Sequence, residues 1–344
     1  MHGGNETMPR HHPHAPVQLQ RRKALGLLGA GTLAMAAAPF GRACAAEDWP
    51  QRPISYVVPF PAGGLTDVAA RQVGKALSTS EGWNIVVENR PGGNANIGAA
   101  YVARAEPDGH TWLAITLSHA ANATLFAGKA GYDLLEDLVP LAGIASSPIM
   151  VVVNAKSDIR NMDDLARAAK ARSLAAGSSG NGTPPHLALA LYQSLTGAEM
   201  LHVPYKGGAP SLTDLIGGQI DVVFSNYPES LPHVKGGALR ALAITSQARS
   251  ADLPDVPTVA EVGLPGLVVD NFTGVLAPAG TPPERVERIG RAIVEQVGQP
   301  AMRDSLAQLG FVAQPRGPAE FKQYLGEEVE RWSRIIRQAN IQAG

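Results

Sequence analysis

The stretch VVPFPAGGLTD, from Val57 to Asp67, is the most informative part of this 344-residue sequence. An apolar run over Ile54–Phe60 predicts a buried β-strand. It leads directly into the loop Pro61–Gly64, and a helical pattern follows from about Thr66 to Leu77. Gly and Pro are the residues that allow a sharp turn between a strand and a helix. The stretch therefore predicts one strand–loop–helix unit of an α/β fold.

Short apolar strands alternate with helical stretches through the rest of the chain, as far as an amphipathic helix over Pro318–Gln338. This alternation predicts an α/β fold of two lobes, each a mainly parallel sheet flanked by helices, with a ligand cleft between the lobes. No linker separates the halves, so we expect strands to cross between them near Pro148–Asn154 and Val268–Leu276. We predict that residues 46–147 and 271–344 form lobe 1 and that residues 148–270 form lobe 2.

The first 45 residues have the pattern of a cleaved signal peptide. Arg21, Arg22 and Lys23 precede an uncharged run over Ala24–Phe40, and Ala43-Cys44-Ala45 offers the small residues of a cleavage site. A membrane anchor is the alternative, but a run of 17 residues is at the lower limit for spanning a bilayer. We therefore predict export to the periplasm, by either the twin-arginine or the Sec route.

Charge and cysteine content exclude several functions for the mature chain. The leader holds five of the 29 Lys and Arg and one of the 30 Asp and Glu, which leaves a net charge of −5. A basic patch for nucleic acid is therefore not expected. The single cysteine, Cys44, lies beside the predicted cut. A cysteine-free mature chain has no disulfide, no thiol nucleophile and no thiolate ligand for a metal.

Enzyme motifs are not evident. Gly177-Ser178-Ser179-Gly180 is not the Gly-x-Ser-x-Gly turn of hydrolases, and no Gly-Lys-Ser/Thr phosphate loop is present. The five mature histidines lack the spacing of metal ligands. We expect no cofactor, no metal and no catalysis. A serine hydrolase that uses Ser178 or Ser179 is the alternative.

Three loops rich in small hydrogen-bonding residues follow predicted strands and precede or open helices. They are residues 60–67, Ser118-His119 and residues 178–183. Free N–H groups at a helix N-terminus can hold an anion without Arg or Lys. Loops of this composition also occur for backbone reasons alone. Because two such loops fall in separate halves of the chain, we predict a cleft for a small anion.

Motifs along the whole mature chain resemble those of the Bug receptors, the periplasmic solute-binding proteins of tripartite tricarboxylate transporters. The matching segments are Trp49-Pro50-x-Arg52-Pro53-Ile54, VVPFPAGGLTD (57–67), VENRPG (87–92), Asn96-Ile97-Gly98, Pro107-Asp108-Gly109-His110-Thr111, HVPYKGG (202–208), Gly217-Gly218-Gln219-Ile220-Asp221, LRALAITS (239–246), LPDVPTVAEVG (253–263) and APAGTP (277–282).

The resemblance implies a receptor that closes two lobes around a small carboxylate, either a di- or tricarboxylate or an aromatic acid, and delivers it to membrane transporter subunits. A ligand-dependent partner of a membrane sensor kinase is the alternative. We expect a monomer. The resemblance and the loops together give as candidate ligand-binding residues Phe60, Ala62, Gly63, Gly64, Thr66, Asp67, Ser118, Ser178, Ser179, Thr183, His186, Lys206, Ser225 and Phe272.

Some of these residues also have a purely structural interpretation. Asp67 could offset the dipole of its helix, His186 could make a structural hydrogen bond, and Lys206 could be solvated. Ser225 stands where the family commonly has Asp, and Phe272 where it frequently has Trp. The loss of a carboxylate at Ser225 favours a purely anionic or aromatic ligand over one with an amino group.

Overall fold

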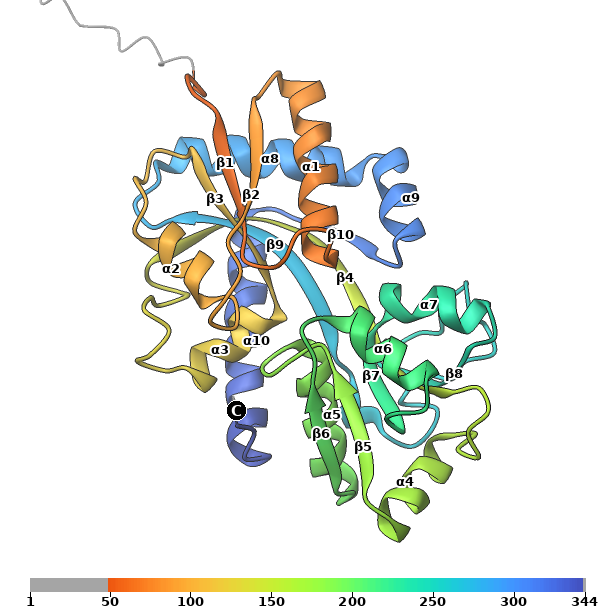
Figure 1. The fold of residues 1–344 in the computed structure, drawn as a ribbon. Coiled ribbons are helices and arrows are strands. Elements are labelled where there is room, and N and C mark those ends of the chain that lie inside the picture. Colours follow the sequence, from red (N-terminus) through yellow and green to blue (C-terminus); the bar gives the residue numbers. More distant parts are fainter. Residues whose placement is uncertain (1–48, 343–344) are drawn as a thin grey trace, which may run out of the picture. The chain divides into compact units, whose positions relative to one another are not determined.

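The computed structural model describes residues 49–342, which form one compact unit (Figure 1). The predicted signal peptide and its cleavage site lie outside the described residues. Helices cover both faces of a mixed sheet whose strands follow the order β2-β1-β3-β9-β4-β7-β5-β6, with β10 and β8 also paired to β4. The predicted α/β class is therefore confirmed.

The first part of the chain builds one end of the sheet. Its elements are β1 Ile54–Val58, α1 Leu65–Glu81, β2 Ile85–Asn89, α2 Asn96–Ala103, β3 Thr111–Thr116 and α3 Leu117–Leu125. Strand β1 is parallel to both β2 and β3. Its side chains alternate between two cores, because Tyr56 and Val58 pack with α1 and α8 whereas Val57 packs with α2 and α3. This strand is thus buried on both faces, as its apolar sequence predicts.

The second part of the chain builds the other end. Its elements are α4 Met162–Ala171, β5 Leu174–Ser178, α5 Pro184–Thr196, β6 Met200–Pro204, α6 Gly208–Ile216, β7 Val222–Asn226, α7 Tyr227–Lys235 and β8 Leu239–Ile244. Strand β5 is parallel to both β6 and β7. The carboxyl ends of these three strands therefore lie at one edge of the sheet, where their loops can meet.

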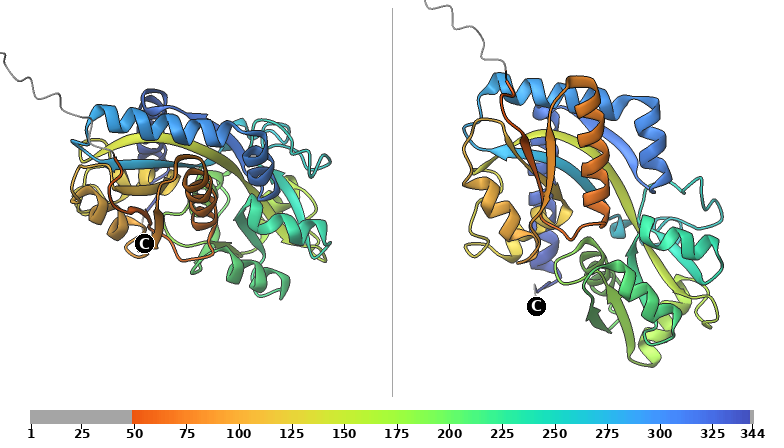
Figure 2. Two further views of the ribbon diagram at one scale, coloured as in Figure 1. Left: turned by 90° about the horizontal axis from the view of Figure 1, so that it is seen from above. Right: turned by 45° about the horizontal axis from the view of Figure 1, so that its top comes forward.

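Two strands join the two ends of the sheet. Strand β4, Leu138–Asn154, pairs with β9, Asp270–Pro278, as far as Pro148 and then with β7 and β8 from Ile149 onward. Figure 2 shows both as long curved strands. All antiparallel pairings involve β4 or β9, so the sheet is mixed, and parallel only within each end. The apolar sequence over residues 139–155 therefore belongs to one long strand that crosses between the two ends of the sheet.

The last part of the chain returns to the first end of the sheet, and its C-terminal residues then extend toward the second end. Its elements are the short 3₁₀ helix η1 Pro265–Leu267, α8 Pro283–Gly298, α9 Pro300–Gln308, β10 Val312–Arg316 and α10 Pro318–Gln338. Helix α10 begins over β4 and β9, where Phe321 packs. Residues 338–342 line a hollow of about 680 Å³ together with α5 and β6. The C-terminal segment thus contacts both ends of the sheet, and the lobe boundaries stay a prediction.

Two paired glycines allow α10 to approach the crossing strands. Gly143 of β4 lies opposite Gly274 of β9, and the Phe321 ring covers both. A Cβ atom on Gly274 would lie 2.1 Å from Cζ of Phe321 and 2.9 Å from the backbone oxygen of Ala142. Neither the ring nor the strand has room to move in a packed core.

We therefore expect the Gly274→Ala variant to have a free energy of unfolding lower by roughly 1–3 kcal/mol, the usual cost of overpacking. Urea denaturation would measure it. Gly326→Ala is the matched control, because Gly326 lies inside α10 with no atom within 4 Å of an added Cβ. This control should gain about 0.5–1 kcal/mol from helix propensity. Equal stability of the two variants would contradict the packing argument.

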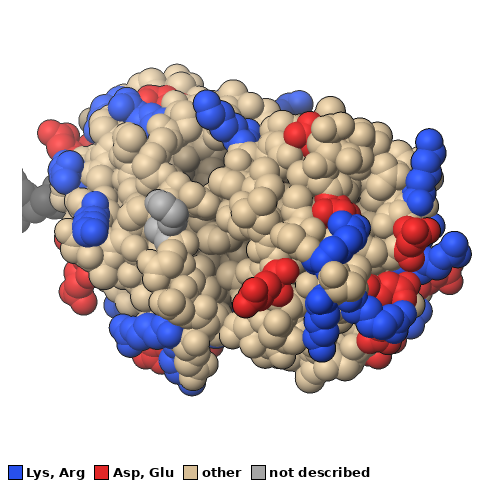
Figure 3. Space-filling view, turned by 60° about the horizontal axis from the view of Figure 1, so that its bottom comes forward, with Lys and Arg blue, Asp and Glu red and all other residues tan. Residues whose placement is uncertain are grey.

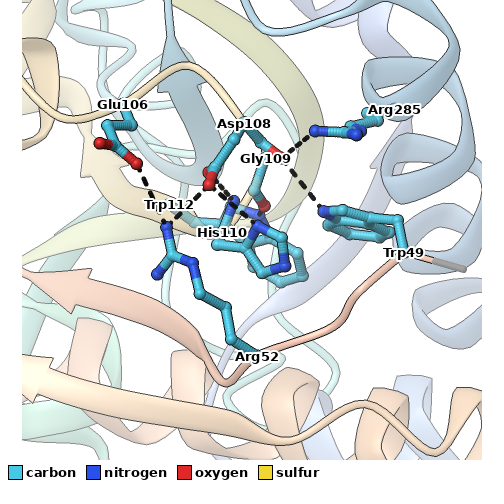
Figure 4. Close-up of polar contacts among 8 residues, drawn as sticks. All are labelled: Trp49, Arg52, Glu106, Asp108, Gly109, His110, Trp112 and Arg285. Atoms are coloured by element: carbon cyan, nitrogen blue, oxygen red, sulfur yellow. Dashed lines mark hydrogen bonds and ion pairs between the residues drawn. The ribbon is translucent and has the colours of Figure 1, made fainter. Parts of the chain in front are cut away.

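The motif residues near Asp108 hold the first described residues against β3 and α8 (Figure 4). The backbone oxygen of Asp108 accepts hydrogen bonds from Trp49 Nε1 at 3.1 Å and Arg285 Nη1 at 2.8 Å. Its carboxylate accepts from Arg52 Nη2 at 2.7 Å and from the His110 backbone N–H at 2.9 Å. These hydrogen bonds hold the segment that begins at Trp49 against the rest of the fold. The motifs around Trp49 and Asp108 therefore have a structural role.

Candidate functional site

The loop after β1 has an exposed, glycine-dependent backbone. Gly63 has φ +78°, a conformation that favours glycine, whereas Gly64 has an ordinary φ of −73°. Gly64 is the N-cap of α1 and offers no side-chain cap, so the first N–H groups of this 17-residue helix are open to a ligand. Phe60 and Ala62 are partly or fully exposed beside it, and Thr66 is buried in the first turn.

The buried side chain of Asp67, in the first turn of α1, holds this loop in its conformation. Its side chain is only 2% exposed, and it accepts hydrogen bonds from the Gly63 backbone N–H at 2.9 Å, Arg71 Nε at 3.0 Å and Asn89 Nδ2 at 2.8 Å. Burial alone would raise the pKa of Asp67, but the bonds from Arg71, Gly63 and Asn89 outweigh it and hold the pKa below its ordinary value. Each carboxylate oxygen thus has protein partners. Asp67 positions the loop, and its carboxylate bonds to Gly63, Arg71 and Asn89 and not to the first N–H groups of α1.

The residues after β3 offer two neutral donors. The prediction of a loop at Ser118-His119 is wrong, because α3 begins at Leu117 directly after β3 and both residues lie in its first turn. Thr116 caps α3, and its backbone N–H donates to Nδ1 of His119 at 3.1 Å. Because burial lowers the pKa of His119 to about 4, the ring is neutral near pH 7 and carries its proton on Nε2. Neither His119 Nε2 nor Ser118 Oγ has a hydrogen-bond partner among the described residues. His119 was not among the candidates, and its ring is nearly perpendicular to the Phe60 ring, with 6.1 Å between the ring centres.

The loop after β5 is built around a pair of stacked histidines. His186 accepts a hydrogen bond on Nδ1 from the Gly182 backbone N–H at 3.1 Å, and its ring stacks on His202 at 4.2 Å. Burial lowers the pKa of each ring to about 4, and in His186 the neighbouring His202 adds to the shift. His186 therefore makes the structural hydrogen bond that was the alternative for it. Thr183 closes the same turn, because its hydroxyl donates to the Gly180 oxygen at 2.7 Å.

Ser178 has a histidine partner that its sequence neighbourhood did not reveal. Its Oγ lies 2.6 Å from Nε2 of His202, and it also bonds to both backbone groups of Gly180. A hydrolase would need an exposed nucleophile and a group that orients the base. Ser178 is fully buried, and His202 has no hydrogen bond or ion pair with an Asp or Glu of the described residues. The contact therefore fixes the loop. Ser179 Oγ is buried without a described partner.

The three remaining candidates lie in different surroundings. Lys206 is exposed at the carboxyl end of β6, which fits the solvated alternative. Ser225 is 1% exposed near the end of β7, and its hydroxyl donates to the Asn226 backbone oxygen at 3.1 Å. Phe272 is in the core, where its ring packs edge-on against Tyr324 of α10 at 5.2 Å. The structure thus gives Phe272 a packing role.

The loops of the two ends of the sheet touch at Gly182. An added Cβ there would lie 3.5 Å from Asn122 Oδ1 of α3 and 3.6 Å from Asn94 Nδ2, before α2. Asn122 Oδ1 is buried without a described partner, and its Nδ2 donates to the Asn94 oxygen at 2.7 Å. The loop after β5 is therefore a neighbour of α3 and of the loop between β2 and α2, with Gly182 as the point of contact.

The charge around these loops is low. Among residues 59–67, 117–119 and 178–183, Asp67 is the one with a charged side chain, and its charge is paired with Arg71. The face of the molecule in Figure 3 carries its Lys, Arg, Asp and Glu side chains mainly on two flanks, with few between them. In residues 49–342 no group of three His, Cys, Asp or Glu is placed to hold a metal ion. No helix in this range is long and apolar enough to cross a membrane.

The fold and the facing loops define a two-lobed solute-binding protein of the periplasmic-binding-protein class. The family described as tripartite tricarboxylate transporter family receptor matches residues 69–341. The chain belongs to this receptor family. Among curated relatives, "Protein BugT" of Bordetella pertussis is 37% identical over 300 residues, covering 85% of this chain and 91% of the relative. A UPF0065 protein of the tcbD-tcbE intergenic region in Pseudomonas sp. strain P51 is also 37% identical, covering 88% of this chain and 90% of that protein.

Solved structures agree with this assignment. A Rhodopseudomonas palustris protein, Rpa4515 with adipate, is 34% identical with a TM-score of 0.80, covering 86% of this chain and 99% of that one. MatC (Rpa3494) from R. palustris, with bound malate, is 31% identical with a TM-score of 0.77, covering 83% and 99%. The periplasmic binding protein BugD is 29% identical with a TM-score of 0.78, covering 86% and 99%. The predicted family and two-lobed fold are confirmed.

Proposed function

We propose that this chain is a periplasmic receptor that binds a small carboxylate between its lobes and delivers it to the membrane subunits of a tripartite tricarboxylate transporter. The observation that carries the proposal is the open N-terminus of α1, held in place by Asp67 and Gly63. Such a helix end stabilises an anion through its N–H groups and dipole. The relatives with adipate and malate support the ligand class.

The ligand would be held by neutral donors from both lobes. The first lobe contributes the backbone from Phe60 to Thr66 and the free donors of Ser118 and His119. The second contributes Ser179 and the turn that ends at Thr183. Neutral donors are strong partners of a carboxylate once water is excluded. Closure of the lobes would exclude water, and the contact at Gly182 would be part of the closed state.

A thermal-shift screen of residues 46–344 against small di-, tri- and aromatic carboxylates tests this function. A ligand at about 100 times its dissociation constant should add about 2.7 kcal/mol to the stability of the folded state. Diamines of the same chain lengths are the control, because a helix N-terminus repels cations. The result that would overturn the proposal is a panel in which no carboxylate raises the unfolding temperature.

A further inference from the structure

A second carboxylate, that of Glu229, lies at the carboxyl edge of β7, close to the loop after β5. Glu229 is in the first turn of α7, directly after β7, and it reaches the start of α6. A Cβ atom on Gly208 would lie 1.9 Å from its Oε2, so the carboxylate rests on the bare backbone of Gly208. Only glycine at position 208 leaves this space.

The position of this carboxylate connects it to the predicted ligand loop. The backbone N–H of Gly207, beside Gly208, donates to the Ser179 oxygen at 3.2 Å. The neighbouring Tyr205 N–H donates to the Ser178 oxygen at 3.1 Å. The loop after β5 and the start of α6 are thus fastened together, and Glu229 lies on the same carboxyl edge of the sheet as Ser179.

Glu229 is half-buried, and few protein donors reach its carboxylate. Its single described partner is Asn226 Nδ2 at 3.2 Å, and it has no ion pair with a described Lys or Arg. Burial raises its pKa above the ordinary value, although the Asn226 bond lowers it. Asn226 Oδ1 in turn accepts from Asn271 Nδ2 at 3.1 Å, and Asn271 Oδ1 is buried without a described partner. Oε1 of Glu229 has no described partner and is open to solvent, so a ligand that carries a donor can replace the water there.

We propose that Glu229 is a specificity residue that accepts a hydrogen bond from a hydroxyl or ammonium group on the bound carboxylate. The inference rests on the proposed function and narrows its ligand class to hydroxy- or amino-carboxylates. It also reverses the expectation drawn from Ser225. The side chain at 225 carries no charge, but the first turn of α7 supplies a carboxylate four residues later.

Isothermal titration with two sets of matched acids tests this assignment. One set is succinate, malate and aspartate, and the other is adipate, 2-hydroxyadipate and 2-aminoadipate. Within each set the acids differ only at the 2-position. The wild-type chain should bind a substituted acid about tenfold or more tightly than its unsubstituted parent, the usual effect of a hydrogen bond to a charged group. Comparison of the hydroxy and amino acids identifies the donor.

The Glu229→Gln variant should reduce that preference to about twofold, because it removes the charge and keeps the shape. Glu229→Asp keeps the charge and should retain part of the preference. Glu284→Gln is the matched control, since Glu284 is exposed in the first turn of α8, and it should bind like the wild type. An undiminished preference in Glu229→Gln would overturn the assignment, as would equal binding of parent and substituted acids. Failure of all six acids also overturns it, and the proposed function stands if another carboxylate of the panel binds.

Discussion

Replacement of Asp67 by alanine should weaken carboxylate binding by about a hundredfold and lower the free energy of unfolding by about 2 kcal/mol. The buried carboxylate joins Gly63, Arg71 and Asn89. Its loss leaves a backbone N–H and an amide without their partner, and the loop that presents the α1 N-terminus loses its shape. Titration with the acid found in the thermal screen measures the affinity, and urea denaturation measures the stability.

The matched control for this variant is Asp163→Ala. Asp163 is also acidic and in the first turn of a helix, but it is exposed on α4. Its removal should cost only the dipole interaction, about 0.3–1 kcal/mol, and leave affinity unchanged. If Asp67→Ala behaves like Asp163→Ala in both measurements, Asp67 merely balances the helix dipole and does not position the loop.

Helices and strands could be predicted from the sequence wherever the apolar periodicity agreed with the residues that start or end an element. Helix α10 begins at Pro318 and ends at Gln338 as predicted, because a helix-starting proline precedes a clear apolar stripe. A helix was expected after Ser118-His119, but α3 begins earlier, since Leu117 follows β3 without a turn residue. Its capping box uses His119 where Glu or Gln is usual, so the ordinary signature is absent. Strand β10 was not predicted, because its sequence, VAQPR, is largely polar and contains proline.

The loops of the candidate site were predictable, but the roles of their residues were not. Small residues after apolar strands mark the loops locally, within a few positions of the chain. The partners of Asp67 and Ser178 are Asn89 and His202, which lie 22 and 24 residues away and come from other strands. Glu229 meets Gly208 only because α6 and α7 start side by side. Such pairings depend on the register of the sheet, and local patterns carry no information about it.

The Gly182→Asn variant should bind its carboxylate about a hundredfold more weakly than the wild type while its fold stays intact. Asparagine tolerates the φ of +69° at this position, so the local backbone can be kept. Its side chain must enter the space where Asn122 Oδ1 and Asn94 Nδ2 lie 3.5 and 3.6 Å from a Cβ. The loop after β5 would be held away from α3 and from the loop between β2 and α2, and a receptor that cannot close leaves its ligand in water.

Gly197→Asn is the control for this effect. Gly197 has φ +65° at the end of α5, and no atom lies within 4 Å of an added Cβ. This variant therefore makes the same chemical change under the same backbone constraint, without a neighbour. Small-angle scattering with and without ligand should show compaction for the wild type and Gly197→Asn, but not for Gly182→Asn. If Gly182→Asn compacts and binds normally, the contact between the two loops is incidental to closure, and binding depends on the helix N-terminus of the first lobe alone.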